Sequence, residues 1–422
     1  MSISSRFCVL SSTLLPNLKV SLLCFVAVSP SLGTAFSAIG RVILVCLALA
    51  LLVVSMIGKK QSLNLYFSPL AVSILASIFY MGLSISWSDV ALHDSLNALT
   101  RHARILSIIL VVLVISSQSE AKVMLRAFVA GQVFVVLSAW LLVLSADVPW
   151  ATAATAKTSF AVFGSYLEQS ISQAVLAAIL WFQRDWIFGR HGRWVAVCLA
   201  LASVVLTLGY MNGRTGTLVC LALIFFAVFK EVPRKFLGVA CVAAFAMTLL
   251  GIGSSKTMFD RFLQVKSEVN AYSQKSATGT SSGQRLLYWQ VSTELIEKRP
   301  FLGYGVGSWN KHYQIQQDGR ADPGTLKVID PHQLFLLWAV EGGLLGLSLL
   351  AVVFINIFYC SRQQKRSNAF CLQAVLLALI ISSLFNSMIY GIGMGDFFCI
   401  AFGILLWASA EPPSYKTNGQ HV

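Results

Sequence analysis

The chain has 422 residues, of which 57% are hydrophobic and only 11% are charged. An ordinary soluble domain is excluded, because so few charged side chains cannot supply a water-exposed surface. The formal net charge is +14, and in so apolar a chain we attribute it mainly to membrane topology and not to binding of nucleic acid. The sequence therefore predicts an all-α polytopic membrane protein.

Apolar runs recur along most of the chain, and we expect about 12 of them to be transmembrane helices, since a spanning helix needs about 20 mostly apolar residues. We place them at 8–30, 38–57, 67–86, 104–117, 122–146, 160–182, 194–211, 215–229, 235–254, 332–359, 369–390 and 393–409. The first run resembles a signal peptide. We interpret it as an uncleaved span, because its removal would change the parity that the charge distribution supports.

The lysines and arginines give the orientation. With a cytoplasmic N-terminus most of those in short loops lie inside, as the positive-inside rule requires. The short outside loops carry only Arg41, Arg101, Arg104, Lys157 and Arg214. This predicts cytoplasmic termini and four parts: helices 1–9 in 1–254, a large periplasmic loop in 255–331, helices 10–12 in 332–409 and a short cytoplasmic tail in 410–422.

Within the large loop, an amphipathic helix is predicted over about 282–298. Leu287, Val291 and Leu295 recur there at a spacing of four residues. Arg285 lies in the first turn, where the helix dipole disfavours a positive charge, and a bound anion would compensate for it. The alternative is that Arg285 reaches lipid headgroups.

Two further features point to an anion at the outer surface. Arg214 is the only charge in the tight turn GYMNGRTG, and Arg101 and Arg104 can extend the basic surface. Gly303 and Gly305 alternate with other residues in a loop whose backbone N–H groups can approach phosphate. A headgroup contact for the arginine and a plain packing turn for the glycines remain the alternatives.

Histidine stands at the mouth of the tenth apolar run. Asp330 and Pro331 predict a helix start, which puts His332 in the first turn, where it can be neutral and accept a proton. The alternative is an interfacial polar residue that anchors the helix.

Three acidic residues lie in or near the spans, at Glu168, Glu341 and Asp396, and intramembrane carboxylates are candidates for function. Glu341 and His332 point to opposite faces of a straight helix, so we expect Glu341 to form hydrogen bonds inside the bundle. Asp396 opens the last span on the outer side and is the better candidate neighbour for the outer site. The cysteines lie in or beside apolar runs, and their spacing predicts neither disulfides nor a metal site.

The stretch HQLFLLWAVEGGLLG resembles the H-[NSQ]-x9-G-x-x-G signature of the O-antigen ligase family, with His332, Gln333, Gly343 and Gly346 at the signature positions. The expected spans and the single large loop are also similar to that family. The resemblance implies a GT-C-like glycosyltransferase in the inner membrane of a Gram-negative bacterium. Its donor would be an undecaprenyl-diphosphate-linked glycan and its acceptor a sugar hydroxyl of lipid A–core, with neither a metal nor another cofactor.

The resemblance also implies roles for three residues. The essential histidine of the family corresponds to His332, and its two essential periplasmic arginines correspond to Arg214 and Arg285. Arginine is always charged and forked for phosphate oxygens, so it suits a diphosphate leaving group. A neutral histidine suits the acceptor hydroxyl, from which it would take a proton.

Three other functions remain open. An O-antigen polymerase often carries R-x10-G motifs in two large loops, whereas no outside arginine here has glycine eleven positions on and only one loop is large. A protein O-oligosaccharyltransferase would use the same donor with a serine or threonine acceptor. A transporter of lipid-linked glycans would have charges along a central cavity.

Overall fold

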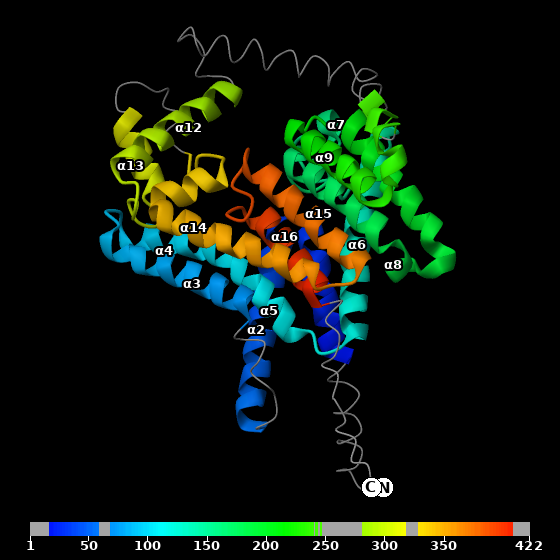
Figure 1. The fold of residues 1–422 in the computed structure, drawn as a ribbon, viewed down its shortest axis with the longest axis horizontal. Coiled ribbons are helices and arrows are strands. Elements are labelled where there is room, and N and C mark those ends of the chain that lie inside the picture. The colour runs from blue at the N-terminus through cyan, green and yellow to red at the C-terminus, as the bar shows by residue number, and fades with distance from the viewer. Residues whose placement is uncertain are drawn as a thin grey trace.

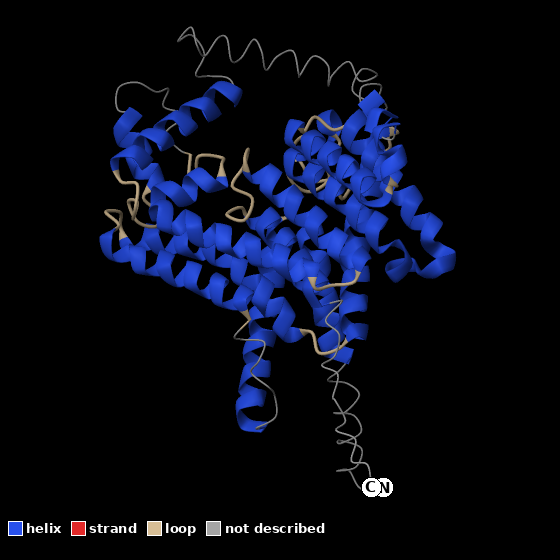
Figure 2. Cartoon of the chain, in the orientation of Figure 1, coloured by secondary structure: helices blue, strands red, loops and turns tan. Residues whose placement is uncertain are grey.

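The computed structural model describes residues 17–58, 68–239, 241–243, 245–246, 281–317 and 328–407. The regular structure in these residues is helical, and they contain no strand (Figure 2). This confirms the all-helical class.

Most helices of the first half follow the expected apolar runs, whereas those at Leu92–His102 and Ala156–Ser159 lie outside them. The described helices of this half are Asn17–Ser31, α2 (Thr34–Gly58), α3 (Pro69–Leu83), α4 (Leu92–His102), α5 (Leu106–Val114), α6 (Gln118–Val143), α7 (Ala156–Ser159), α8 (Tyr166–Gly209) and α9 (Arg214–Glu231). Serine hydroxyls begin three of them: Ser68 accepts from the backbone N–H of Ala71, Ser117 from that of Glu120 and Ser165 from that of Leu167. The runs 160–182 and 194–211 are both part of α8, which is interrupted at Gly189, where φ is +74°.

The described residues of the second half contain five further α-helices. They are α12 (Ser281–Lys298), α13 (Trp309–Gln317), α14 (Leu334–Arg362), α15 (Arg366–Ser383) and α16 (Ile392–Trp407). A helix lies where the sequence predicts one, as α12, and its Val291 and Leu295 are buried, while its amphipathic character stays a prediction. Helices α12 and α13 lie together at one end of the protein, beside the start of α14 (Figure 1).

By length and composition, seven helices among the described residues could cross a membrane. Their ranges are Thr34–Val53, Pro69–Trp87, Leu92–Val114, Gln118–Val143, Tyr166–Gly209, Leu334–Arg362 and Arg366–Ser383. Asn17–Ser31 and Ile392–Trp407 are shorter apolar helices. The chain is thus a polytopic helical membrane protein. The expected count of 12 and the GT-C-like fold stay predictions, and the run 235–254 lies largely outside the described residues.

Helix α16 is the most enclosed helix, and it packs against α5, α2, α6 and α15. Phe397, Phe398 and Phe402 are fully buried in it. Gly403 allows a close approach of α5, because a Cβ there would lie 2.5 Å from Cβ of Val111. Lipid tails are as apolar as these side chains, so close packing of this kind stabilises the bundle where burial alone contributes little.

Helix α14 is broken in its N-terminal part, and a loop fills the break. Gly343 has φ +64°, outside the helical region. The loop after α12 supplies substitute partners: the N–H of Tyr304 donates to the carbonyl of Val340 at 2.9 Å, and the N–H of Leu344 donates to the carbonyl of Pro300 at 2.7 Å. Backbone groups freed by a break need such partners where water is scarce. The loop and the helix therefore form one unit that fixes the start of α14.

Candidate functional site

The segment before α14 differs from the expected helix start. The prediction that Asp330 and Pro331 begin the helix is wrong, because α14 begins at Leu334 with Gln333 as its N-cap. His332 precedes the cap and has φ +50°, a left-handed conformation that is uncommon for histidine. Such backbone strain, on the order of 1–3 kcal/mol, is often found at functional sites.

Asp330 holds His332 in this conformation. One oxygen of its buried carboxylate, Oδ1, accepts from the backbone N–H of His332 at 2.8 Å and from the hydroxyl of Ser387 at 2.6 Å. The same oxygen lies 3.7 Å from Nδ1 of the imidazole, and the ring of Tyr288 lies 6.0 Å from it, centroid to centroid. The His332 side chain is 44% exposed, so it is oriented by the protein yet open to a ligand.

The protein around His332 lowers its pKa below the usual value of 6.5. Burial is the main cause and the positive charge of Arg285 adds to it, while the Asp330 carboxylate opposes both. The imidazole is therefore neutral at neutral pH and can accept a proton, as the sequence indicated.

His332 opens into a pocket of about 300 Å³. Its wall is built from the start of α8, the loop before α14, the segment between α15 and α16, and single side chains of α4 and α12. The lining residues are Arg101, Ser165, Leu167, Glu168, Arg285, Ile329, Asp330, His332, Asn386, Ser387, Met388, Tyr390, Gly391 and Met394.

Arg285 and Arg214 meet at one side of this pocket. Arg285 projects from α12 into the lining, and its Nη2 lies 3.4 Å from Oδ1 of Asn386. Arg214 begins α9 and donates from Nη1 to the hydroxyl of Ser282 on α12 at 3.1 Å. Burial lowers the pKa of Arg285, and the charge of Arg214 lowers it further. Two cations that destabilise each other favour an anion between them, so this side suits phosphate.

Arg101 and Arg104, the other two arginines named from the sequence, differ in their position relative to the pocket. Arg101 lines the pocket, with its guanidinium carbon 5.3 Å from the ring centroid of Tyr390. Arg104 is buried and donates from Nη1 to the carbonyl of Tyr390, which ties α4 and its extension to the pocket wall. Arg101 can reach a ligand, whereas Arg104 supports the wall from behind.

Asp396 does not line the pocket. Its carboxylate is 1% exposed and pairs with Arg41 in a forked contact, from Nε to Oδ1 at 3.0 Å and from Nη2 to Oδ2 at 2.9 Å. The structure therefore gives it a packing role between α2 and α16 and does not bring it to His332.

Gly303 and Gly305 also lie away from the pocket lining. Both have positive φ, and a Cβ on Gly303 would lie 2.5 Å from the carbonyl oxygen of Val340. The N–H of Gly305 donates to the carbonyl of Glu341 at 2.9 Å, so it is not available to a phosphate. These glycines allow the loop to pack into the break of α14.

Residues 195–351 match the family model described as O-antigen ligase. This segment of the chain is similar to the O-antigen ligase family. The match includes Arg214, Arg285 and His332, and it ends before the pocket segment 386–391. The comparison with curated proteins finds no match for this chain.

The glycines of the O-antigen ligase signature have a physical reason here. Gly343 must be glycine, because its φ is positive and a Cβ would lie 2.2 Å from the carbonyl oxygen of Phe301. Gly346 faces the ring of Tyr80, 3.3 Å from where its Cβ would be. The hydroxyl of Tyr80 donates to the carbonyl of Gly342 at 2.7 Å. The small residues thus let α3 and the loop after α12 approach α14.

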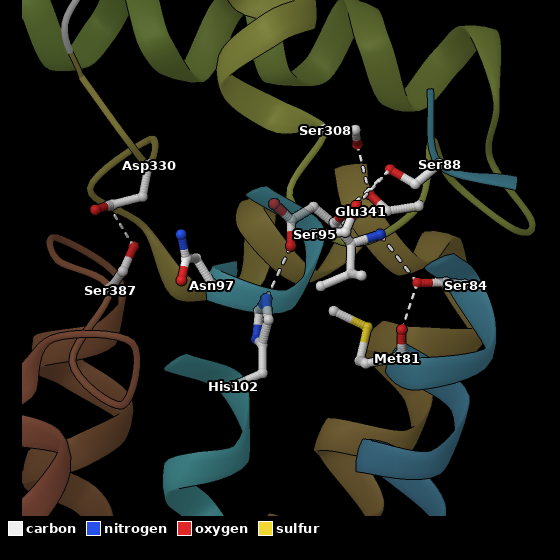
Figure 3. A network of polar contacts seen from close by, with 12 residues as sticks. Met81, Ser84, Ser88, Ser95, Asn97, His102, Ser308, Asp330, Glu341 and Ser387 are labelled. Atoms are coloured by element: carbon white, nitrogen blue, oxygen red, sulfur yellow. Dashed lines mark hydrogen bonds and ion pairs between the residues drawn. The ribbon is translucent and has the colours of Figure 1, made fainter. Parts of the chain in front are cut away.

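The expectation that Glu341 bonds inside the bundle is confirmed, and its partner was not foreseen. Its carboxylate contacts Nε2 of His102 at 2.8 Å, and both side chains are 1% exposed (Figure 3). The His102 ring in turn packs on Tyr390, with centroids 4.9 Å apart. A buried histidine next to two outside arginines was the only sequence signal for this contact.

The segment that follows α15 was missed as part of the site. The sequence predicted a span to residue 390, but α15 ends at Ser383 and the chain then turns through Asn386 and Ser387 along the pocket. Asn and Ser close to a glycine at 391 favour a turn, and this was the available signal. For metals, the described residues contain no group of three or more histidine, cysteine or acidic side chains that could hold an ion.

Proposed function

We propose that the protein is an O-antigen ligase. It transfers a glycan from undecaprenyl diphosphate to a sugar hydroxyl of lipid A–core, at a pocket that faces the periplasm of a Gram-negative inner membrane. The observation that carries the proposal is the pairing in one pocket of a neutral, partly exposed histidine with arginines suited to phosphate. The family match supports the class of reaction. The charge bias supports the orientation, since it places Arg101, Arg214 and Arg285 outside.

The reaction is a single displacement. The imidazole of His332 takes the proton of the acceptor hydroxyl, and that oxygen forms a bond with the anomeric carbon of the donor glycan. The bond between this carbon and the diphosphate oxygen breaks at the same time, so the anomeric configuration inverts. The electron pair leaves with the diphosphate, whose charge Arg285 and Arg214 stabilise.

The arginines and His332 meet different requirements of the transition state. Diphosphate is a good leaving group once its charge is neutralised, which fixed guanidinium groups do without reorganisation. A sugar hydroxyl is a poor nucleophile, and a positioned base typically contributes about 10²–10⁴-fold to the rate. His332 meets the requirement because Asp330 fixes it through its backbone N–H, while the side chain stays 44% exposed.

The test is genetic and chemical. The host gene is deleted and complemented with wild type, His332→Ala or the exposed-histidine control His93→Ala. Lipopolysaccharide and undecaprenyl-linked glycan are then separated side by side. We expect His332→Ala to lose polymer on lipid A–core while full-length polymer accumulates on undecaprenyl diphosphate, and His93→Ala to behave as wild type.

Other outcomes of these experiments would indicate one of the alternative functions. Polymer shortened to one repeat on the core would identify a polymerase, and glycan on protein would identify a protein O-oligosaccharyltransferase. Failure of purified protein to transfer glycan in detergent, where no second compartment exists, would favour a transporter.

A further inference from the structure

We infer that Glu168 binds hydroxyl groups of a sugar substrate and thereby orients the glycan relative to His332. This rests on the proposed function and adds to it the part of the pocket that receives sugar. Glu168 lies in the first turn of α8 and lines the same pocket as His332 and Arg285.

Glu168 differs from the other enclosed carboxylates in having no partner. Asp330, Glu341 and Asp396 are held by Ser387, His102 and Arg41, as described above. Within the described part of the chain, the Glu168 carboxylate makes no hydrogen bond or ion pair. A carboxylate in a pocket that leaves its acceptors unused is suited to a ligand that donates.

The surroundings of the carboxylate are kept open by glycine. A Cβ on Gly164 would lie 3.6 Å from Oε2 of Glu168, and a Cβ on Gly393 would lie 3.8 Å from it. With hydrogen in those places, space remains on two sides of this oxygen. Neither residue places a side chain against this oxygen, and Glu168 lines the pocket.

A second, smaller cavity of about 60 Å³ adjoins the first, and Glu168 lines both, as do Ser165 and Met394. Its lining is largely apolar but includes the side chain of Gln132, which is 2% exposed. The Gln132 amide donates to the hydroxyl of Ser31 at 2.8 Å, while its carbonyl oxygen has no hydrogen-bond partner in the described structure. Two unused acceptors therefore lie at this end of the pocket.

The arginines and Glu168 suit different parts of the substrate. Ionised phosphate only accepts hydrogen bonds, so it belongs with the arginines and is repelled by Glu168. Sugar hydroxyls donate, and one carboxylate can accept from two neighbouring hydroxyls. The glycan therefore extends toward Glu168 while the diphosphate stays at Arg285, and His332 lines the same pocket.

The test compares Glu168→Gln and Glu168→Ala with Asp185→Asn, which removes an exposed carboxylate from the same helix. Purified protein is supplied with undecaprenyl-diphosphate-linked glycan and lipid A–core, and KM is measured for each. Hydrogen bonds to a charged group are strong enough that we expect KM for the glycan bound there to rise about tenfold in Glu168→Gln and more in Glu168→Ala. A rise for lipid A–core assigns Glu168 to the acceptor sugar, and a rise for the donor assigns it to the donor sugar.

Inhibition by a competitor distinguishes the role of Glu168 from that of Arg285. Undecaprenyl diphosphate without sugar should inhibit Glu168→Ala as it inhibits wild type, whereas Arg285→Ala should lose that inhibition. A role limited to the helix dipole would lower the thermal midpoint and leave both KM values unchanged, and this outcome overturns the inference. If wild type itself transfers no glycan, the proposed function fails. If wild type transfers and both Glu168 variants match it, only the inference fails.

Discussion

His102 and Glu341 contact each other at 2.8 Å, although 239 residues of sequence separate them. One belongs to α4 and the other to the signature segment of α14 (Figure 3). Through Tyr390, on which the His102 ring packs, this contact supports the pocket wall from behind.

We expect His102→Ala to lower the free energy of unfolding by about 3 kcal/mol, because it leaves the Glu341 carboxylate buried without a partner. His93→Ala, on the exposed face of the same helix, should change it by less than about 0.5 kcal/mol. Denaturant titration of the purified protein, followed by tryptophan fluorescence, measures both. Equal stability of the two variants would contradict this role.

The pH dependence of transfer should follow His332. As a base it must be unprotonated, so the rate falls as pH falls through its pKa, which lies below 6.5. Asp330→Asn removes the negative charge that opposes this shift, and the acid limb should then move to still lower pH. Initial rates of transfer measured from about pH 4.5 to about 8 would show the acid limb of the pH profile. A limb centred above 6.5, or a shift upward in Asp330→Asn, would argue against His332 as the base.

Gly343→Ala should be among the most damaging single-methyl additions to the chain. The new Cβ would meet the carbonyl oxygen of Phe301, which is backbone and cannot rotate away, and φ is unfavourable for alanine. We expect a loss of more than about 2 kcal/mol and loss of transfer. Gly209→Ala is the matched control, since nothing lies within 4 Å of its Cβ position. The thermal midpoint of each variant in detergent checks the prediction, and a stable, active Gly343→Ala would refute it.

Asp396→Ala should destabilise the protein by about 3–5 kcal/mol, because it leaves the guanidinium of Arg41 without its partner in a largely enclosed position. The double variant Arg41→Leu with Asp396→Leu removes both charges and should recover most of this loss. KM for the donor should be unaffected in the double variant, since neither residue lines the pocket. A large rise in KM there would show that Asp396 acts on the substrate.

The sequence predicted those features that depend on local pattern. Apolar runs predicted the helices, and the four-residue spacing of Leu287, Val291 and Leu295 predicted α12. The resemblance to the family selected His332, Arg214 and Arg285, and the structure places them around one pocket or beside it.

Features that depend on contacts distant in sequence were not predictable. The pocket wall at Asn386 and Ser387 looked like part of an apolar run, because hydropathy does not show where a helix ends inside a membrane protein. Asp396 was expected to be a neighbour of His332, because the sequence indicates how deep in the span a residue lies. It does not indicate toward which neighbouring helix the side chain points. The left-handed turn at His332 depends on Ser387 and Asp330, which only the folded chain brings together.

The inserted loop in the break of α14 has a practical consequence for protein engineering. Its carbonyl and N–H groups replace those that the helix lacks between Val340 and Leu345, so neither segment can be exchanged alone. A chimaera that takes residues 281–317 from a protein of similar sequence should also take the first turns of α14 from that same protein. Chain fragments cut between them should associate only if both halves keep this set of backbone contacts.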